Sequence, residues 1–136
     1  MRPWMRGALV IVIVVTVAVA CRDTGPMDDE EALARGELLY DRHCVDCHGG
    51  ATGGSIDDIP PPHNAQGHTW HHADCDLIDM VIEGLPQREG YPEMPAFGDE
   101  LSVDEVEAIL TYIKTWWEPD QREIQAEITE RFCDGA

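Results

Sequence analysis

Cys44-Val45-Asp46-Cys47-His48 is the stretch of this sequence that decides how the chain folds. Its pattern, C-x-x-C-H, is the spacing at which a haem is covalently attached. Two cysteines three positions apart occupy neighbouring places on a helical turn, so both sulfurs can reach one edge of a porphyrin. The imidazole of His48 follows directly and can turn beneath the ring. We therefore predict thioether bonds from Cys44 and Cys47 and an axial iron ligand at His48.

Two other kinds of C-x-x-C site agree less well with the rest of the chain. A structural zinc site uses four nitrogen or sulfur ligands, usually as two paired sets, and the sequence has no second closely spaced cysteine pair. A redox-active C-x-x-C lies near a βαβ pattern, which this sequence does not have. The spacing therefore favours one covalent haem.

A helix is predicted immediately upstream of the motif, from about Asp28 to His43. Four consecutive acidic residues fill its first turn, where the helix dipole favours negative charge. Apolar or small residues then recur at spacings of three and four. The residues on this face are Leu33, Gly36, Leu39 and Tyr40.

Three more helices are predicted downstream. Residues 74–83 form the first, with Gly84 as its stop. Ser102 and Glu105 have the S-x-x-E spacing of a capping box and open the second. We expect Pro119 to end it, because a residue before proline avoids helical angles. A last helix follows over the C-terminal extension, and the apolar stripes of these two helices are Val106, Ile109, Leu110, Ile113 and Trp117, and then Ile124, Ile128 and Phe132.

A long irregular segment, residues 49–73, lies between the motif and these helices. It contains five glycines and three consecutive prolines, which exclude regular helix or strand over most of it. A loop of this length in a compact domain usually has a function, and wrapping a cofactor is one. Since no segment alternates apolar and polar residues as a strand does, the chain is predicted to be all-α.

With these features in place, the chain resembles the single-haem class I cytochromes c over about residues 32–117. Gly36 and Tyr40 precede the first motif cysteine by eight and four positions, as the small and aromatic residues of that family's first helix do. Residues 108–114 resemble the family's final helix. The resemblance implies a cytochrome c fold, in which N- and C-terminal helices cross around the covalently bound haem c. Residues 118–136 add a helical extension.

The resemblance implies that Met94 is the second axial ligand. It lies 46 residues after His48, between Pro92 and Pro95, and the family carries its methionine in a loop just before the last helix. A thioether favours ferrous iron, so His/Met ligation raises the reduction potential. Met27 lies in the linker, and Met80 is interpreted as a core residue.

Other ligands are alternatives, because the attachment motif does not determine the second axial position. Four histidines of the long loop could take it and give bis-histidine ligation with a lower potential. His68, His71 and His72 could also bind a separate metal ion, although a polar loop facing solvent is the preferred interpretation. The four alternative ligands are His63, His68, His71 and His72.

Two residues of the long loop are expected to support the haem. The second ring N–H of an axial histidine is usually held by a carbonyl or carboxylate. The family uses a proline carbonyl about twelve residues on, where Pro60 stands with Pro61 and Pro62 behind it, and the sequence does not decide which of the three serves. Trp70 is expected to donate its indole N–H to a haem propionate, as a family tryptophan does. Partial burial at the haem edge is the alternative role for Trp70.

The N-terminus has the pattern of an export signal. Residues 1–20 combine two arginines with an uncharged, largely apolar run of 14 residues that ends in small side chains. This run is shorter than the ~20 residues that span a bilayer. Ala-Val-Ala before Cys21 resembles the lipobox of bacterial lipoproteins and implies a lipid on Cys21, followed by an acidic linker over residues 21–31. An uncleaved anchor and plain secretion are the alternatives, and all three place the domain outside the cytoplasm, on the periplasmic side or cell surface.

Two cysteines are left after Cys21 and the haem pair are assigned, namely Cys75 and Cys133. In an oxidising compartment such a pair often forms a disulfide, and we predict one here. The alternative is two free thiols that lie too far apart to be joined.

The formal net charge of -18 argues against nucleic-acid binding, because it repels phosphates. The same charge could steer the protein to a basic partner. The predicted function is that of a membrane-tethered single-electron carrier between a donor and an acceptor redox protein, and not of an enzyme. The alternatives are a haem-based gas sensor or a small peroxidase, which both need an open iron position, and a cytochrome subunit of a larger redox complex.

Overall fold

The computed structural model describes residues 29–54 and 59–133, so the predicted export signal, Cys21 and nearly all of the acidic linker lie outside the described residues. Within these residues the backbone forms helices and only isolated β-bridges. The all-α prediction is therefore confirmed. No helix in the described ranges is long and apolar enough to cross a membrane. The helices are α1 (Asp29–His43), α2 (Val45–His48), the 3-10 helix η2 (Thr69–His71), α3 (Asp74–Glu83), α4 (Val103–Lys114) and α5 (Pro119–Cys133).

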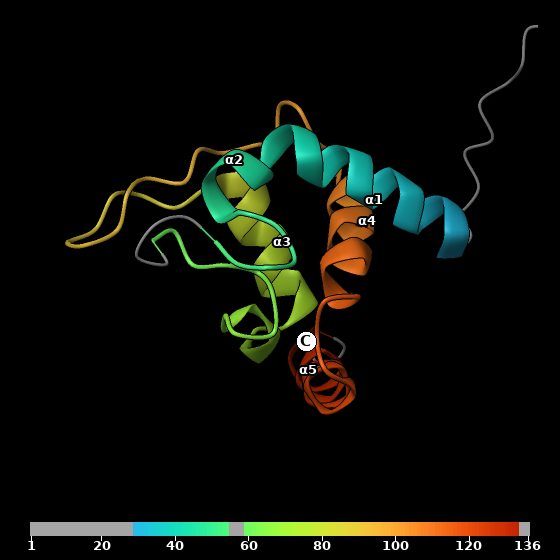
Figure 1. Cartoon of the computed structure of the whole chain (residues 1–136). Coiled ribbons are helices and arrows are strands. Elements are labelled where there is room, and N and C mark those ends of the chain that lie inside the picture. The colour runs from blue at the N-terminus through green and yellow to red at the C-terminus, as the bar shows by residue number, and fades with distance from the viewer. Residues whose placement is uncertain (1–28, 55–58, 134–136) are drawn as a thin grey trace, which may run out of the picture.

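Helices α1 and α4 cross each other, and the remaining elements are arranged around them (Figure 1). Gly36 is buried at the crossing. A Cβ atom at this position would overlap the carbonyl group of Ala108 and lie 3.0 Å from the Cβ atom of Tyr112. Only glycine lets the two backbones approach this closely, which confirms the expected crossing of N- and C-terminal helices.

The hydrophobic core lies beneath this crossing and receives side chains from α1, α3 and α4. Each buried aliphatic or aromatic side chain contributes about 1.5–3 kcal/mol relative to an exposed one. Tyr40 and Val106 are the most completely buried, with exposed fractions of 1% and 0%. The core residues are Leu39, Tyr40, Leu77, Leu101, Val106, Ile109, Leu110, Ile113 and Trp117.

The start of α4 was predicted correctly, and its end was not. The hydroxyl of Ser102 accepts from the backbone N–H of Glu105, and the Glu105 carboxylate accepts in return from the backbone N–H of Ser102. The helix then ends at Lys114 rather than at Pro119, and Pro119 is instead the first residue of α5. A proline is tolerated there because the first N–H groups of a helix have no partner within it.

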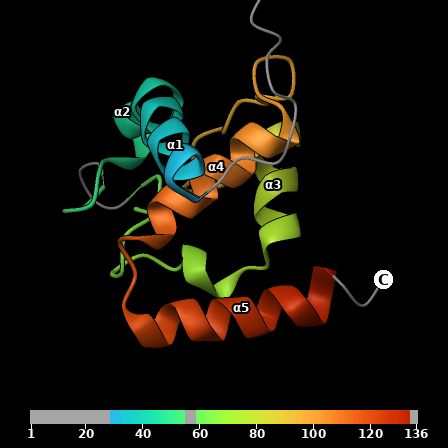
Figure 2. The same cartoon turned by 90° about the vertical axis from the view of Figure 1, so that its right-hand side faces the viewer.

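Helix α5 lies along the end of the molecule formed by η2 and the first turn of α3 (Figure 2). Most of its predicted apolar stripe does not make this contact: Ile124 and Phe132 are 43% and 61% exposed, and only Ile128 is partly buried. The inner face is polar instead. The amide of Gln125, which is 2% exposed, donates to the carbonyl of His72 at 3.3 Å and to the carboxylate of Asp74 at 2.7 Å.

A disulfide joins Cys75 of α3 to Cys133 at the end of α5, with their Cα atoms 5.8 Å apart. This is the pairing that the sequence analysis expected for the two remaining cysteines. Lys114 at the end of α4 also donates to Asp74, at 2.6 Å. The C-terminal extension is thereby fixed to the first turn of α3 by a covalent bond and a buried amide, and the ion pair joins the end of α4 to the same turn.

Candidate functional site

Cys44, Cys47 and His48 lie on one helical turn. The backbone N–H of Cys44 donates to the carbonyl of Tyr40 at 2.9 Å, and the N–H of His48 donates to the carbonyl of Cys44 at 2.9 Å. The chain therefore continues helically from α1 into α2. Both cysteines are free thiols, with Cys44 partly buried and Cys47 exposed. Burial, and then the proximity of Cys47, raise the pKa of the Cys44 thiol to about 11.

The ring of His48 is held at one nitrogen only. Its Nδ1 atom lies 2.8 Å from the carbonyl oxygen of Pro61, to which it can only donate. This leaves Nε2 as the nitrogen that can bind a metal. Burial lowers the pKa of His48, although the hydrogen bond to Pro61 opposes this effect. The ring is therefore neutral at neutral pH, as a metal ligand must be.

The acceptor for His48 is a correction to the choice of Pro60, which stands at the family spacing: it is Pro61, one of the two other prolines that the sequence left open. Pro61 stands 13 residues after His48 rather than twelve. The three consecutive prolines offer a carbonyl at each position, and the intervening glycine-rich loop decides which one faces the ring. Sequence spacing alone does not determine that geometry.

A buried tyrosine fixes the point at which this loop leaves α2. The hydroxyl of Tyr40 donates to the carbonyl of Gly49 at 2.7 Å. Gly49 has a positive φ of 70°, and a Cβ atom there would overlap the backbone of Gly53. Burial is the main cause that raises the pKa of Tyr40. The tyrosine thus stays protonated and holds the loop directly after the attachment motif.

His63 lies flat against the axial histidine candidate. The ring centroids of His48 and His63 are 4.1 Å apart, with 24° between their planes. The Nδ1 atom of His63 lies 2.8 Å from the hydroxyl of Thr69. Burial, followed by the proximity of His48 and His68, lowers the pKa of His63 to about 3. The sequence analysis considered His63 only as an alternative ligand, and a stack beside His48 is not a position across the iron from it.

In the described part of the loop, no other histidine stacks on His48, although His68 lies near enough to His63 to lower the pKa of that ring. His68 and His71 are exposed, and the rings of His68 and His72 are 5.7 Å apart. Among the described residues, no group of three or more His, Cys, Asp or Glu side chains is placed to hold a metal ion.

Trp70 is partly buried, and its indole N–H donates to the carbonyl of Gly67 at 3.0 Å. The short turn from Gly67 to Trp70 brings this acceptor within reach. Donation to a haem propionate stays a prediction. Another indole, from Trp117, donates to the carbonyl of His63 at 2.8 Å. The sequence analysis saw Trp117 only as part of an apolar stripe.

Met94 lies in the loop between α3 and α4, and this loop is pinned where it leaves and rejoins α3. Leu85 and Met94 exchange two backbone hydrogen bonds, at 2.9 and 3.0 Å, and Phe97 donates to the carbonyl of Val81 at 3.0 Å. Gly84 has a φ of 73°, and a Cβ atom there would lie 2.7 Å from the Met94 carbonyl oxygen. The side chain of Met94 is partly buried, and Met80 packs against the core as expected.

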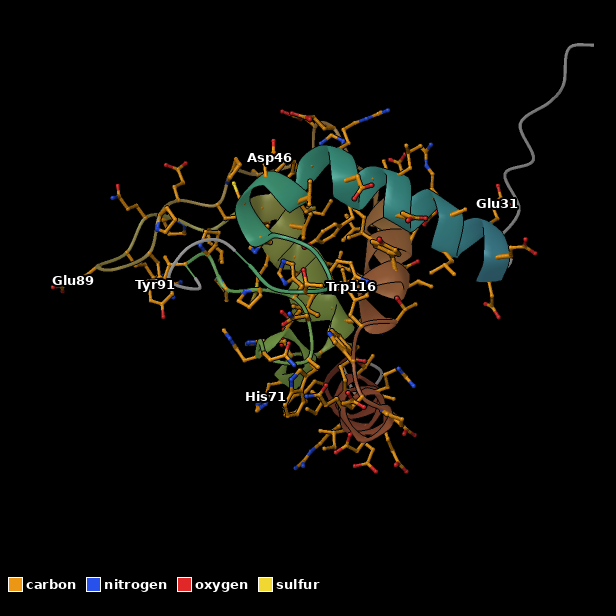
Figure 3. All side chains as sticks on the ribbon, viewed as in Figure 1. Glu31, Asp46, His71, Glu89, Tyr91 and Trp116 are labelled. Carbon is orange, nitrogen blue, oxygen red and sulfur yellow. A yellow bond between two sulfur atoms is a disulfide. The ribbon has the colours of Figure 1, made fainter. Side chains whose placement is uncertain are left out.

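This loop and the chain after α2 project to the same side of the molecule (Figure 1). Glu89 and Tyr91 lie at the tip of the loop, far from Trp116 in the body of the fold (Figure 3). The loop that contains Pro61 and the loop that contains Met94 thus extend from the same side of the helices.

The donor set fits a covalent haem. It comprises two free thiols on one turn, a neutral imidazole with Nε2 available, and a thioether in a pinned loop. Partly buried apolar side chains that pack against the core supply the low-dielectric surroundings that such a group needs. Those nearest in sequence to the donors or on α3 are Val45, Ile78, Val81, Ile82 and Phe97.

A comparison with protein families gives one match. The family model described as cytochrome c oxidase, cbb3-type, subunit III matches residues 31–113. This range holds both motif cysteines, His48 and Met94, and it ends before α5. No curated protein and no solved structure matches the chain.

Proposed function

The chain belongs to the family of cytochrome c oxidase, cbb3-type, subunit III, and from this premise we propose that it carries single electrons on a haem iron bound between His48 and Met94. Membership makes the chain a c-type cytochrome with one covalent haem that takes part in electron transfer with redox partners. The ligands, the tether and the exact role are our proposal.

The single observation that carries this proposal is the geometry of the turn from Cys44 to His48. Both thiols and the imidazole come from one turn, and the Pro61 carbonyl occupies Nδ1 at 2.8 Å. Such a partner sets the tautomer and orientation of a metal-binding histidine and raises its basicity. His48 is therefore prepared to bind through Nε2 before any metal arrives.

The bound haem supplies a one-electron iron couple, and the residues of this chain set its conditions. Met94 offers a soft thioether that favours the ferrous state. Its loop is pinned by the backbone bonds of Leu85 and Phe97, so the sulfur needs little ordering when it binds. His48 and Met94 would hold the iron, and the haem would supply one-electron transfer in which no bond is made or broken.

The test is the spectrum of the purified holoprotein and of Met94→Ala. We expect a methionine-to-ferric-iron charge-transfer band in the wild type and its loss in the variant, together with rapid carbon monoxide binding by the reduced variant only. Met80→Leu is the matched control, because Met80 packs against the core. A band that persists in Met94→Ala would refute the ligand assignment. Rapid carbon monoxide binding by the wild type would favour a gas sensor or a peroxidase.

A fixed subunit of a larger redox complex is the second candidate, because the description of the matched family names an oxidase subunit. A free carrier should leave its native membrane in mild detergent as a single small species. Co-elution with haem-containing partners at constant stoichiometry would favour the subunit role instead.

The membrane tether is proposed from residues outside the described ranges. The lipobox-like sequence before Cys21 supports a lipid anchor on an exported protein, with residues 21–31 as the linker to the domain at 32–117. Cys21→Ser should release the holoprotein from the membrane fraction. Retention of that variant in the membrane would favour an uncleaved anchor.

A further inference from the structure

We propose that His63 is a positioning residue for His48, whose ring plane it fixes by lying flat against it. The inference rests on the proposed role of His48 as an axial ligand, and it gives His63 a role different from the alternative ligand that the sequence analysis considered. His63 itself does not bind the iron in this arrangement. It acts through the ring that does.

The stack restricts a motion that the hydrogen bond of His48 does not. One bond from Nδ1 to Pro61 holds one atom of the ring, and the ring can still tilt about that contact. The face of His63 lies 4.1 Å away at 24°, so a tilt toward it meets a second ring. Tyr40 approaches His63 edge-on, at 6.1 Å between centroids and 78°, which confines His63 further.

His63 is itself fixed by both its side chain and its backbone. The hydroxyl of Thr69 lies 2.8 Å from its Nδ1 atom, and the indole N–H of Trp117 donates to its carbonyl at 2.8 Å. Thr69 and Trp117 are 6% and 3% exposed. The ring of His63 can therefore not slide off His48 unless at least one buried hydrogen bond breaks.

The C-terminal extension holds the segment that follows His63. The amide of Gln121 donates to the carbonyl of Ala65 at 3.0 Å, and Gln125 donates to the carbonyl of His72 at 3.3 Å. The disulfide at Cys133 closes this contact. Helix α5, which lies beyond the residues that match the family, therefore supports the segment that follows the stacked histidine.

Two measurable properties should depend on His63. In the ferric protein, the plane of an axial imidazole sets how unpaired spin is spread over the haem methyl groups. The surroundings of a ligand also tune the potential, because a drier shell disfavours the extra charge of ferric iron. Loss of the His63 ring should therefore change the spin distribution and lower the potential.

The experiment measures proton NMR of the ferric holoprotein, its potentiometric titration and its haem content for His63→Ala, His63→Phe and Thr69→Val. We expect His63→Ala to rearrange the shifted methyl resonances. It should also raise the ferric-to-ferrous ratio at a fixed ambient potential at least threefold, or about 28 mV at 59 mV per tenfold. His63→Phe should keep the wild-type methyl order, since it retains a flat ring. Thr69→Val should shift the methyls less than His63→Ala does.

His71→Ala is the control, because His71 is an exposed histidine of the same segment. Unchanged methyl order and potential in His63→Ala would overturn the inference, and so would a Phe variant that behaves like the Ala variant. If His63→Ala does not retain haem, Thr69→Val decides: it should shift the methyl resonances relative to the wild type, and an unchanged methyl pattern would overturn the inference. Failure of the proposed function is distinct, because the wild type itself would then lack the spectrum of a histidine- and methionine-bound haem.

Discussion

Replacement of Gly36 by alanine should loosen the crossing of α1 and α4. The added Cβ atom would lie 2.6 Å from the carbonyl carbon of Ala108, whereas ordinary contact begins at 3.4 Å. The helices must therefore separate by at least 0.8 Å, the difference between these two distances. The obstacle is backbone and not the end of a flexible side chain, so neither partner can move aside alone.

The expected loss of stability combines two opposing effects. Overpacking costs about 1–3 kcal/mol and occasionally more, and the backbone contact puts this site at the upper end. Alanine in place of glycine returns about 0.5–1 kcal/mol through helix propensity. We therefore expect the free energy of unfolding to fall by about 2 kcal/mol, measured on the holoprotein by guanidinium unfolding followed by far-UV circular dichroism.

The control for this prediction is Ala34→Gly on the exposed side of the same helix. That change should cost about 1 kcal/mol through propensity alone. Opposite substitutions two residues apart should thus both destabilise the protein. If Gly36→Ala left the unfolding midpoint unchanged or raised it, α1 and α4 could not be in the backbone contact described.

Two further predictions concern the disulfide and the buried tyrosine. Replacing both Cys75 and Cys133 by serine should lower the free energy of unfolding by about 4 kcal/mol, from the chain-entropy relation at a separation of 58 residues; a loss below about 1 kcal/mol in urea unfolding would contradict the pairing. Burial is the main cause that raises the pKa of Tyr40 in the folded state. The stability that the protonated tyrosine contributes to the fold is therefore complete below the unfolded pKa of about 10, and it is lost as pH rises toward the folded value. The free energy of unfolding should fall by up to about 1.4 kcal/mol per pH unit above pH ~10, and Tyr40→Phe should remove that part of the pH dependence. An identical pH dependence in the wild type and the variant would refute this prediction.

Much of the fold could be predicted because it depends on short-range patterns. The S-x-x-E spacing at Ser102 opens α4 with both hydrogen bonds of a capping box, and Gly84 ends α3 as expected. Gly36 lies at the crossing of the first and last family helices. Each of these predictions depended either on residues close together in the sequence or on a single glycine at a position where no side chain fits.

The details of the site could not be predicted because they depend on where loop carbonyls point. Pro61 rather than Pro60 accepts from His48, and nothing in the sequence indicates that Trp70 donates to the carbonyl of Gly67. The stack of His63 on His48 joins residues from either side of a glycine-rich loop. The polar inner face of α5 was missed for a related reason, since its apolar residues suggested that the opposite face would pack.

The most direct test is peptide mapping by mass spectrometry of the protein matured in its own host. We predict that the peptide containing Cys44 and Cys47 carries the mass of one haem, that this mass survives acid extraction, and that neither thiol can be alkylated. An unmodified peptide with two alkylatable thiols would contradict the attachment on which the roles of His48 and Met94 depend.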